Sequence, residues 1–351
     1  MARKKQPFNI RRIAEEAGVS LASVSRVLNN HADISESLRR KVLAAIEANN
    51  LVPDKAVERP LRISVIFDVG DITDFISSIL TGMGDAASDL GIELSIQRCV
   101  GNVSLLRACR NWRCDGVAII CGKTLNHELP SLAAAHLPCM LIDNYYDGPM
   151  CGYIGNASYD CTRQIMQYLH SIGHRRIAYL CGEPPNDDYD ERLRAYNGFM
   201  ESIGQADPAL RIPSELNLFM DSIGRDKERG YQQAKRVISQ LPDVTAMVCA
   251  NDEIAMGCYR GCFDMGRRVG QDISVVGYDD QSFARHLAPG LTTIHIPLTD
   301  IGRRIIRVLH DYLHGTIKEL PHEIITGELV VRGSTGSPCP ESMKLEGVAS
   351  E

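Results

Sequence analysis

The sequence has no segment of the kind that directs a protein to secretion or anchors it in a membrane. Its first ten residues, MARKKQPFNI, are basic, and no apolar stretch follows them. No apolar run in the 351 residues approaches the about 20 residues that a transmembrane helix needs. We therefore expect a cytoplasmic protein with no membrane partner.

The sequence also lacks the cysteine and histidine spacing of a metal site. Twelve cysteines are present, but none forms a CxxC pair, and the two nearest in sequence are Cys258 and Cys262. Several cysteines, such as Cys121 and Cys249, lie in apolar runs, where a reduced thiol behaves as a small hydrophobic group. This pattern predicts a reducing compartment, no disulfide framework, no metal site and no cofactor.

No catalytic signature is present either. The sequence contains no Ser-His-Asp or Cys-His set in a strand–turn–helix elbow. The segment GMGDAA at Gly82 matches G-x-G-x-x-A, but it falls inside a predicted helix rather than just after a strand, so it does not predict dinucleotide binding. Asp279 and Asp280 are adjacent in sequence, so we expect their carboxylates to point apart. We expect that the protein is not an enzyme.

Charge is distributed unevenly along the chain. The formal net charge is −6, but residues 1–60 carry 11 Lys and Arg against 7 Asp and Glu, a net charge of +4, which leaves −10 for the remainder. The length favours two or three domains, and the apolar fraction of 44% allows sizeable cores. This asymmetry predicts a small anion-binding unit in front of a larger acidic body.

The first 50 residues predict three helices in a compact unit. Apolar residues recur at helical spacing, Asn9, Ser20 and Ser35 stand at N-cap positions, and Gly18 supplies the turn after the first helix. This is the spacing of a helix-turn-helix, whose second helix lies in the major groove of DNA. The alternative is a helical hairpin that only packs, for example as an interaction module, but the basic surplus and the linker that follows favour DNA binding.

The second of these helices supplies candidate DNA contacts. Val24 and Val27 face the predicted core, so Leu21, Ala22 and Arg26 project outward. Arg26 suits the O6 and N7 atoms of guanine, and the two apolar side chains suit thymine methyl groups. The candidate DNA-binding residues are Ser20, Leu21, Ala22, Ser23, Arg26 and Asn29, of which the serines and the asparagine suit phosphate contacts.

From Ile63 onward, strands alternate with helices. The pattern predicts strands over 62–67, 92–100, 116–122, 139–146, 175–182, 246–252 and 272–280, and helices over 75–90, 104–112, 127–137, 159–173, 191–204, 236–241 and 253–266. Such alternation is typical of parallel sheets with ligand sites at the carboxyl ends of the strands. Because it continues for longer than one sheet requires, we expect two similar α/β lobes with a cleft between them.

The helix-turn-helix segment IRRIAEEAGVSLASVSRVLNN resembles the N-terminal headpiece of lac-repressor-family regulators. The likeness continues through NNHADISESLRRKVLAAIEANNLVPDKA, GHRRIAYLCG, ERLRAY, CANDEIAMG, DISVVGYDD and LAPGLTTIHIP, which together span nearly the whole chain. The resemblance implies an α/β protein in which an all-α headpiece precedes a two-lobed, periplasmic-binding-protein-like core of parallel sheets flanked by helices. It also implies a homodimer that binds a pseudo-palindromic operator in double-stranded DNA.

This resemblance divides the chain into a headpiece (1–52), a short hinge (53–61), an N-lobe (62–157 plus 297–326), a C-lobe (158–296 plus 327–336) and a polar tail (337–351) that we expect to be disordered and that lacks coiled-coil heptads. The hinge departs from the family, in which a short helix usually wedges a leucine into the minor groove. Pro60 falls at the position where the family has that leucine, and Leu61 follows it. Proline has no backbone N–H to donate within a helix. We therefore expect major-groove contacts to dominate operator binding.

The resemblance also places a small-molecule effector between the lobes. Its candidate contacts are Phe75, which suits stacking on a sugar or base, and the polar residues Asp143, Arg192, Asn251 and Asp279, which suit a polyol. The alternative is that these residues are helix caps, turn residues or surface ion pairs.

Two positions depart from sugar-binding relatives. Ile296 stands where many of them have a polar residue, and Arg225 falls near the usual place of a stacking aromatic. An arginine there would favour a phosphorylated or acidic sugar, unless it is a surface residue.

The sequence therefore predicts a sequence-specific DNA-binding transcriptional regulator, most simply a repressor. A small carbohydrate or carbohydrate derivative, bound between the lobes, would control its DNA binding by allostery. The alternative is a cytoplasmic carbohydrate-binding receptor that does not bind an operator.

Overall fold

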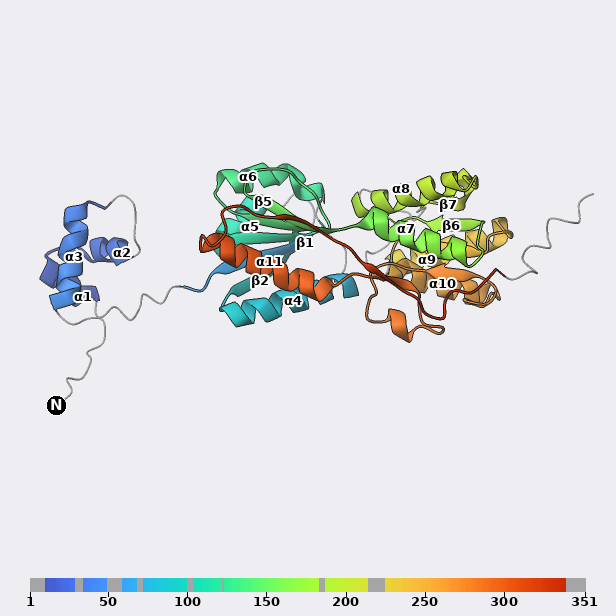
Figure 1. Ribbon diagram of the computed structural model, residues 1–351. Coiled ribbons are helices and arrows are strands. Elements are labelled where there is room, and N and C mark those ends of the chain that lie inside the picture. Colours follow the sequence, from blue (N-terminus) through green and yellow to red (C-terminus); the bar gives the residue numbers. More distant parts are fainter. Residues whose placement is uncertain are drawn as a thin grey trace, which may run out of the picture. The chain divides into compact units, whose positions relative to one another are not determined.

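The computed structural model describes residues 10–28, 34–48, 59–67, 72–99, 104–121, 123–182, 187–213 and 225–338. The chain separates into two compact units, Met1–Pro60 and Leu61–Glu351 (Figure 1). The expected N-cap at Asn9, the contact at Asn29, most of the hinge and most of the tail lie outside the described residues.

The first unit is a bundle of three short helices, as the sequence predicts. Its elements are α1 (Ile10–Ala17), α2 (Leu21–Leu28) and α3 (Glu36–Ala48). Each helix contributes apolar residues to one small core, which contains Ile13, Ala14, Val24, Val27, Val42, Ala45 and Ile46. Because these residues recur at helical spacing, the opposite faces of the helices remain exposed.

Local hydrogen bonds fix the turns of this bundle. Gly18 has a φ of 62°, a left-handed conformation that glycine adopts without strain, and it separates α1 from α2. Ser20 caps α2, because its hydroxyl oxygen accepts a hydrogen bond of 3.1 Å from the backbone N–H of Ser23. Ser35 caps α3 in the same way, accepting from Leu38 N–H at 3.4 Å. Both predicted serine caps are confirmed.

The second unit contains two parallel sheets. Among the described residues, the first sheet has six strands in the order β11 (His322–Ile325), β5 (Cys151–Asn156), β4 (Cys139–Ile142), β3 (Gly116–Ile120), β1 (Arg62–Phe67), β2 (Glu93–Arg98). One face packs on α4 (Asp74–Leu90) and α11 (Leu298–Leu313), and the other on α5 (Leu105–Trp112) and α6 (Leu129–Ala134). Figure 1 shows the sheet between these helix layers.

Alternation of side chains along the strands produces these two cores. In β1, Val65 belongs to the core under α4 and α11, whereas Ile66 belongs to the core under α5 and α6. In β3, Ala118 and Val117 divide in the same manner. Strands that are apolar on both faces are typical of parallel sheets covered by helices on both sides.

The second sheet is shorter and is built on the same plan. Its strands in the described part of the chain follow the order β7 (Arg211–Ile212), β6 (Ile177–Leu180), β8 (Ala246–Cys249), β9 (Ser274–Val276), all parallel. Helices α7 (Ser158–Ser171) and α8 (Asp187–Ser202) pack together, and α9 (Arg225–Gln240) packs on α10 (Asp252–Asp264). The predicted α/β fold with two parallel sheets is confirmed.

The chain passes between the sheets more than once. It leaves the first sheet after β5, returns to it through β10 (Thr293–His295) and α11, and crosses again between β11 and β12 (Glu328–Val330). Strands β10 and β12 pair with each other in antiparallel fashion. Three 3₁₀ segments, η1 (Lys123–Glu128), η2 (Pro208–Leu210) and η3 (Ala284–His286), complete the described elements.

Sequence patterns predicted most of these elements but not all. Strands β5, β7, β10, β11 and β12 and helix α11 have no counterpart among the predicted elements. Strand β5 has the sequence CGYIGN, in which two glycines weaken the strand signal, and β7 has only two residues. These strands depend on pairing with neighbours that are distant in sequence.

Gly82, in the rejected nucleotide-binding motif, has a packing role. It lies within α4, and a Cβ built there would lie 1.8 Å from the backbone oxygen of Thr299 in α11. Reciprocally, a Cβ at Gly302 of α11 would lie 2.1 Å from the backbone oxygen of Ile79. The backbones of α4 and α11 therefore approach more closely than any side chain allows.

No helix in the part of the chain that the structure describes combines the length and the apolar character that crossing a bilayer requires.

Substitution of two nearby glycines tests the close approach of α4 and α11. Gly82→Ala forces the helices apart and should destabilise the protein by about 2 kcal/mol. Gly84→Ala lies in the same helix with no heavy atom near the new methyl group, so it should stabilise by about 0.5–1 kcal/mol through helix propensity. Thermal unfolding of both variants checks this expectation, and a lower melting temperature for Gly84→Ala than for Gly82→Ala would contradict it.

His174 ties the end of the described chain to the second sheet. The ring is 1% exposed; its Nδ1 lies 2.8 Å from Thr245 Oγ1, and its Nε2 lies 3.0 Å from Ser274 Oγ and 2.9 Å from Gly336 O. Because a carbonyl oxygen only accepts, Nε2 carries the hydrogen and Nδ1 accepts. Burial lowers the pKa of His174 below its ordinary value, opposed by the Gly336 hydrogen bond.

This lowered pKa predicts a stability that depends on pH. The folded state favours the neutral ring, so the contribution of His174 is fully present above its unfolded pKa of about 6.5 and is lost as the pH falls below that value. His174→Gln does not titrate. The free energy of unfolding of the wild type minus that of the variant should therefore decrease from about pH 8 to about pH 5 in urea titrations. A constant difference would refute this role.

Candidate functional site

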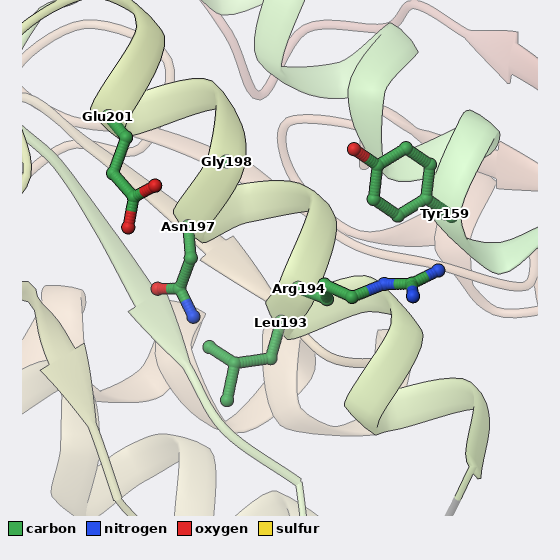
Figure 2. A pocket seen from close by; sticks show the side chains of 6 residues that line it. All are labelled: Tyr159, Leu193, Arg194, Asn197, Gly198 and Glu201. Carbon is green, nitrogen blue, oxygen red and sulfur yellow. The ribbon is translucent and has the colours of Figure 1, made fainter.

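A surface pocket of about 610 Å³ lies on the outer side of α7 and α8 (Figure 2). Figure 2 shows Arg194 reaching toward Tyr159, and the guanidinium carbon lies 5.0 Å from the centre of that ring. The pocket is lined by Tyr159, Leu193, Arg194, Asn197, Gly198 and Glu201. None of the site residues predicted from the sequence is among them.

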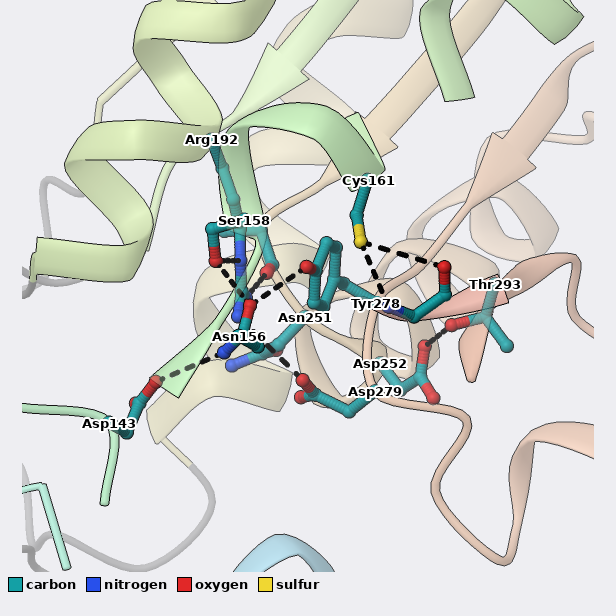
Figure 3. A network of polar contacts seen from close by, with 12 residues as sticks. Asp143, Asn156, Ser158, Cys161, Arg192, Asn251, Asp252, Tyr278, Asp279 and Thr293 are labelled. Atoms are coloured by element: carbon teal, nitrogen blue, oxygen red, sulfur yellow. Dashed lines mark hydrogen bonds and ion pairs between the residues drawn. The ribbon is translucent and has the colours of Figure 1, made fainter. Parts of the chain in front are cut away.

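The predicted polar residues instead follow the carboxyl ends of the strands. Asp143 comes directly after β4, and Asn251 and Asp279 follow β8 and β9 within three residues. Parallel strands place their carboxyl ends at the same edge of a sheet, which brings Asn251 and Asp279 to one edge of the second sheet, whereas Asp143 lies at the corresponding edge of the first. Figure 3 shows Asp143, Arg192 and Asp279 converging on one region.

Arg192 of α8 is the centre of this region. The residue is 3% exposed, and its Nε donates to Ser158 Oγ at 3.3 Å while its Nη1 donates to Ala250 O at 2.5 Å. Its Nη2 lies 3.8 Å from Asp279 Oδ1, and its guanidinium carbon lies 3.6 Å from the centre of the Tyr278 ring. A buried guanidinium requires such partners, because an isolated buried charge is costly.

Asp279 is buried and held in an unusual backbone conformation. The residue is 5% exposed and has a φ of 108°, which strains a non-glycine residue. Burial raises the pKa of Asp279 well above its ordinary value, Arg192 opposes that shift, and the nearby carboxylates of Asp252 and Asp143 add to it. Burial therefore destabilises the charged form of this carboxyl group, and a hydroxyl or a cation that contacts the carboxylate stabilises that form.

Asp252 holds the loop that follows β9 in place by hydrogen bonds. It is fully buried, and its two oxygens accept hydrogen bonds from the Thr293 hydroxyl at 2.7 Å and from the Gln281 backbone N–H at 2.8 Å. Burial raises the pKa of Asp252 to about 7, although these hydrogen bonds favour the charged form. The side chain therefore fixes the loop that follows β9, which carries Asp279.

Asn156 connects the two sheets and was not predicted as a site residue. It is the last residue of β5 in the first sheet, and its Oδ1 accepts from Tyr278, which follows β9 of the second sheet, at 2.9 Å. The same oxygen accepts from the Ser158 hydroxyl at 2.5 Å, and its Nδ2 donates to Asp143 Oδ1 at 3.5 Å. The chain Asp143–Asn156–Tyr278 thus links elements that belong to different sheets.

Asn251 belongs to a neighbouring group of contacts. It caps α10, because its Oδ1 accepts from Ile254 N–H at 2.8 Å, and its Nδ2 donates to Asp226 Oδ2 at 2.6 Å. Asp226 also forms an ion pair with Arg229, which is 2% exposed. The cap interpretation therefore holds for Asn251, and the described contacts join it to α9.

Phe75 lies near the start of α4 and is half-buried against the main apolar core. The adjacent Asp74 accepts a hydrogen bond of 2.6 Å from the backbone N–H of Ser282, in the loop after β9. The two positions that depart from sugar-binding relatives differ in burial, since Ile296 is 3% exposed and Arg225, the first residue of α9, is half-buried.

Sequence reasoning missed Asn156, Ser158, Tyr278 and Asp226. Tyr278 precedes Asp279 in the motif VGYDD, and its place beside a predicted site residue could have identified it. Asn156 and Ser158 had none, because β5 was not predicted. Asp226 contacts Asn251 only through the packing of α9 on α10.

The exposed face of α2 in the first unit has the predicted composition. Leu21 is 47% exposed, and Ala22 and Arg26 are exposed as well, whereas Val24 and Val27 are buried in the three-helix core. The hydroxyl groups of Ser20, which is exposed, and Ser23, which is half-buried, lie 2.8 Å apart at the start of the helix. An exposed helix face with one arginine and small apolar side chains is suited to the major groove of DNA.

Among the described residues, no group of three or more His, Cys, Asp or Glu side chains is arranged to hold a metal ion.

Two family models match this chain. Residues 9–54 match the model described as bacterial regulatory proteins, lacI family, and residues 166–335 match the periplasmic binding protein-like domain. The first match covers α1, α2 and α3. The second covers the second sheet, helix α11 and strands β10, β11 and β12.

Curated relatives are transcriptional repressors. The chain is 29% identical over 336 residues to the HTH-type transcriptional repressor PurR of Mannheimia succiniciproducens, covering 93% of this chain and 98% of that protein. It is 28% identical over 340 residues to the PurR repressor of Photobacterium profundum, with the same coverage of both proteins.

Solved structures give the same result and complete the assignment. A complex of the transcriptional regulator CelR with cellobiose matches with a TM-score of 0.69 and 25% identity, over 93% of this chain and all of that chain. The lac repressor dimer bound to operator and an anti-inducer matches with a TM-score of 0.64 and 25% identity, over 94% of this chain and all of that chain. Together these matches support a transcriptional regulator of the lacI family, and the PurR and lac proteins named above are repressors and not enzymes.

Proposed function

We propose that this protein is a sequence-specific transcriptional repressor whose operator binding is controlled by a small carbohydrate bound at the Arg192 region. The exposed face of α2 is the observation that carries the proposal. In that face, Leu21, Ala22 and Arg26 are available for base contacts, and Val24 and Val27 anchor the helix. Ser20, Ser23 and Asn29 contact phosphates in this proposal, and the protein acts in the cytoplasm.

The effector is held at the carboxyl ends of the two sheets. Arg192, Asp143 and Asp279 offer donors and acceptors in fixed positions, and in this proposal Phe75 and Asn251 also contact the ligand. Such a set suits a polyol, because carboxylate oxygens accept hydrogen bonds from ligand hydroxyls and a guanidinium donates to ligand oxygens. The CelR structure named above contains cellobiose, a carbohydrate, which supports the same ligand class here.

Allosteric control follows from the contacts that join the two sheets. Residues 62–157 with 297–326 form one lobe of this proposal, and residues 158–296 with 327–336 form the other. Tyr278 with Asn156 and Ser282 with Asp74 make hydrogen bonds between them. An effector that binds one lobe arrangement more tightly than the other shifts their populations, and DNA affinity changes with them.

The repressor acts as a homodimer on a pseudo-palindromic operator. The lac repressor structure named above is a dimer on its operator, and two-fold symmetry of a protein matches two half-sites of DNA. Pro60, which has no helical conformation in the structure, supports the prediction that major-groove contacts dominate.

Replacement of Arg26 tests the DNA contacts. Arg26→Ala in the full-length protein should weaken binding to a duplex recovered by random-oligonucleotide selection by about 10- to 100-fold and should reduce its preference over other duplexes. Lys41→Ala removes one exposed charge from α3 instead. It should weaken binding to every duplex by about the same factor, and that factor should be smaller than the loss that Arg26→Ala causes on the selected duplex. If Arg26→Ala keeps the full preference for the selected duplex, α2 does not recognise bases as proposed.

Two arginines of α8 test the effector site. A panel of sugars and sugar phosphates is screened by thermal shift, since specific binding raises the melting temperature. For each compound that binds, Arg192→Lys should weaken binding at least about 10-fold, because the ammonium cannot make the same set of contacts. Arg194→Ala, which removes an arginine whose side chain is 67% exposed, should leave binding unchanged. Equal effects of the two variants would place the ligand elsewhere.

A further inference from the structure

Five cysteines crowd the core between the first sheet and helices α5 and α6. Most of the thiols there are packed as small apolar groups, as the sequence predicts. Four of the five also form two thiol–thiol hydrogen bonds, one between Cys139 and Cys151 on the paired strands β4 and β5 and one between Cys109 and Cys114 at the end of α5. A helix end, and not only strand packing, brings the thiols of the second pair together. The five are Cys99, Cys109, Cys114, Cys139 and Cys151, and all are reduced.

The backbone at the end of α5 brings Cys109 and Cys114 together. Arg113 has a φ of 50°, its N–H donates to Arg110 O at 3.2 Å, and the N–H of Cys114 donates to Cys109 O at 3.2 Å. These two hydrogen bonds define a Schellman motif, in which the side chains of the residues joined by the longer bond contact each other. The two thiols therefore meet through the geometry of the helix end.

The contact makes the two thiols chemically different. The Cys109 thiol donates a hydrogen bond to the Cys114 sulfur, which lowers the pKa of Cys114 to about 7 against the effect of burial, and Ser64 adds a second hydrogen bond. The same hydrogen bond and burial raise the pKa of Cys109. Cys114 is the more exposed of the two, at 8% against 1%. Cys114 is therefore the nucleophile and Cys109 holds the proton.

We propose that Cys109 and Cys114 form a peroxide-responsive dithiol that closes to a disulfide at the end of α5. The Cys114 thiolate attacks an oxygen of hydrogen peroxide, the O–O bond breaks, and a sulfenic acid and hydroxide result. The hydroxide takes the Cys109 proton and becomes water, and the Cys109 sulfur then displaces a second hydroxide from the sulfenic sulfur. That hydroxide takes up the proton that Cys114 released when it formed the thiolate, which gives the second water. In sum, two thiols and one peroxide give one disulfide and two waters, and the thiols lose two electrons.

The cysteine pair lies next to the first residue of β1 through the hydrogen bonds of Asp115. Asp115, which follows Cys114, accepts a hydrogen bond of 2.9 Å from Arg62 N–H and donates its own N–H to Arg62 O at 2.7 Å. Arg62 begins β1 and comes two residues after Pro60 in the chain. A disulfide at Cys114 restrains the segment that holds the first residue of the core, next to the linker to the DNA-binding unit.

Peptide mass mapping tests the proposal on the reduced full-length protein. After brief treatment with hydrogen peroxide and alkylation of the remaining thiols, the Cys109 and Cys114 peptides should be recovered linked and lighter by two hydrogen atoms. The rate should rise about tenfold from pH 6 to pH 8, because the thiolate fraction of a group with a pKa of about 7 rises by that factor. Recovery of both thiols fully alkylated after treatment would overturn the proposal.

The chain provides a matched control in Cys258 and Cys262 of α10. These thiols are also hydrogen bonded to each other, but both are fully buried and the pKa of each is raised, so they should remain reduced. In Cys109→Ser, Cys114 should stop at the sulfenic acid, which dimedone traps. Oxidation of the α10 pair at the same rate, or the absence of a trapped sulfenic acid at Cys114, would equally overturn the assignment.

Discussion

The buried guanidinium of Arg192 is the constraint on which the effector region depends. A charge that is 3% exposed is stable only with partners, and this one takes them from three different segments. Ser158 lies at the start of α7, Ala250 at the end of β8, and the Tyr278–Asp279 pair after β9. Any ligand that contacts Arg192 or Asp279 therefore acts on several elements at once, and this is the physical basis of the control that we propose.

The same region joins the two sheets. Asn156 receives hydrogen bonds from Ser158 and Tyr278 and donates one to Asp143, and it stands where the chain first leaves the first sheet. A relative movement of the sheets must change these contacts. In the proposed function, binding energy at the effector site biases the sheet arrangement, and by thermodynamic linkage a DNA duplex then influences effector binding to the same extent.

Much of the architecture was predictable from sequence, for reasons that particular residues illustrate. The buried strands around Val65 and Val248 and the amphipathic α4 carry strong local patterns, and the serine caps of the headpiece are local hydrogen bonds. Strand β5 and its terminal Asn156 were not predictable, because CGYIGN is a strand only through its neighbours β4 and β11. Arg192, Asp143 and Asp279 were placed by resemblance, whereas the contact of Arg192 with Tyr278 emerged only from the fold.

The central claim is that effector binding at Arg192 and DNA binding by α2 are coupled in one molecule. The most direct test is to measure affinity for a selected duplex with and without a saturating carbohydrate effector, and affinity for that effector with and without the duplex. The account predicts that both affinities change, and by the same factor. A duplex affinity that stays constant at saturating effector would contradict it.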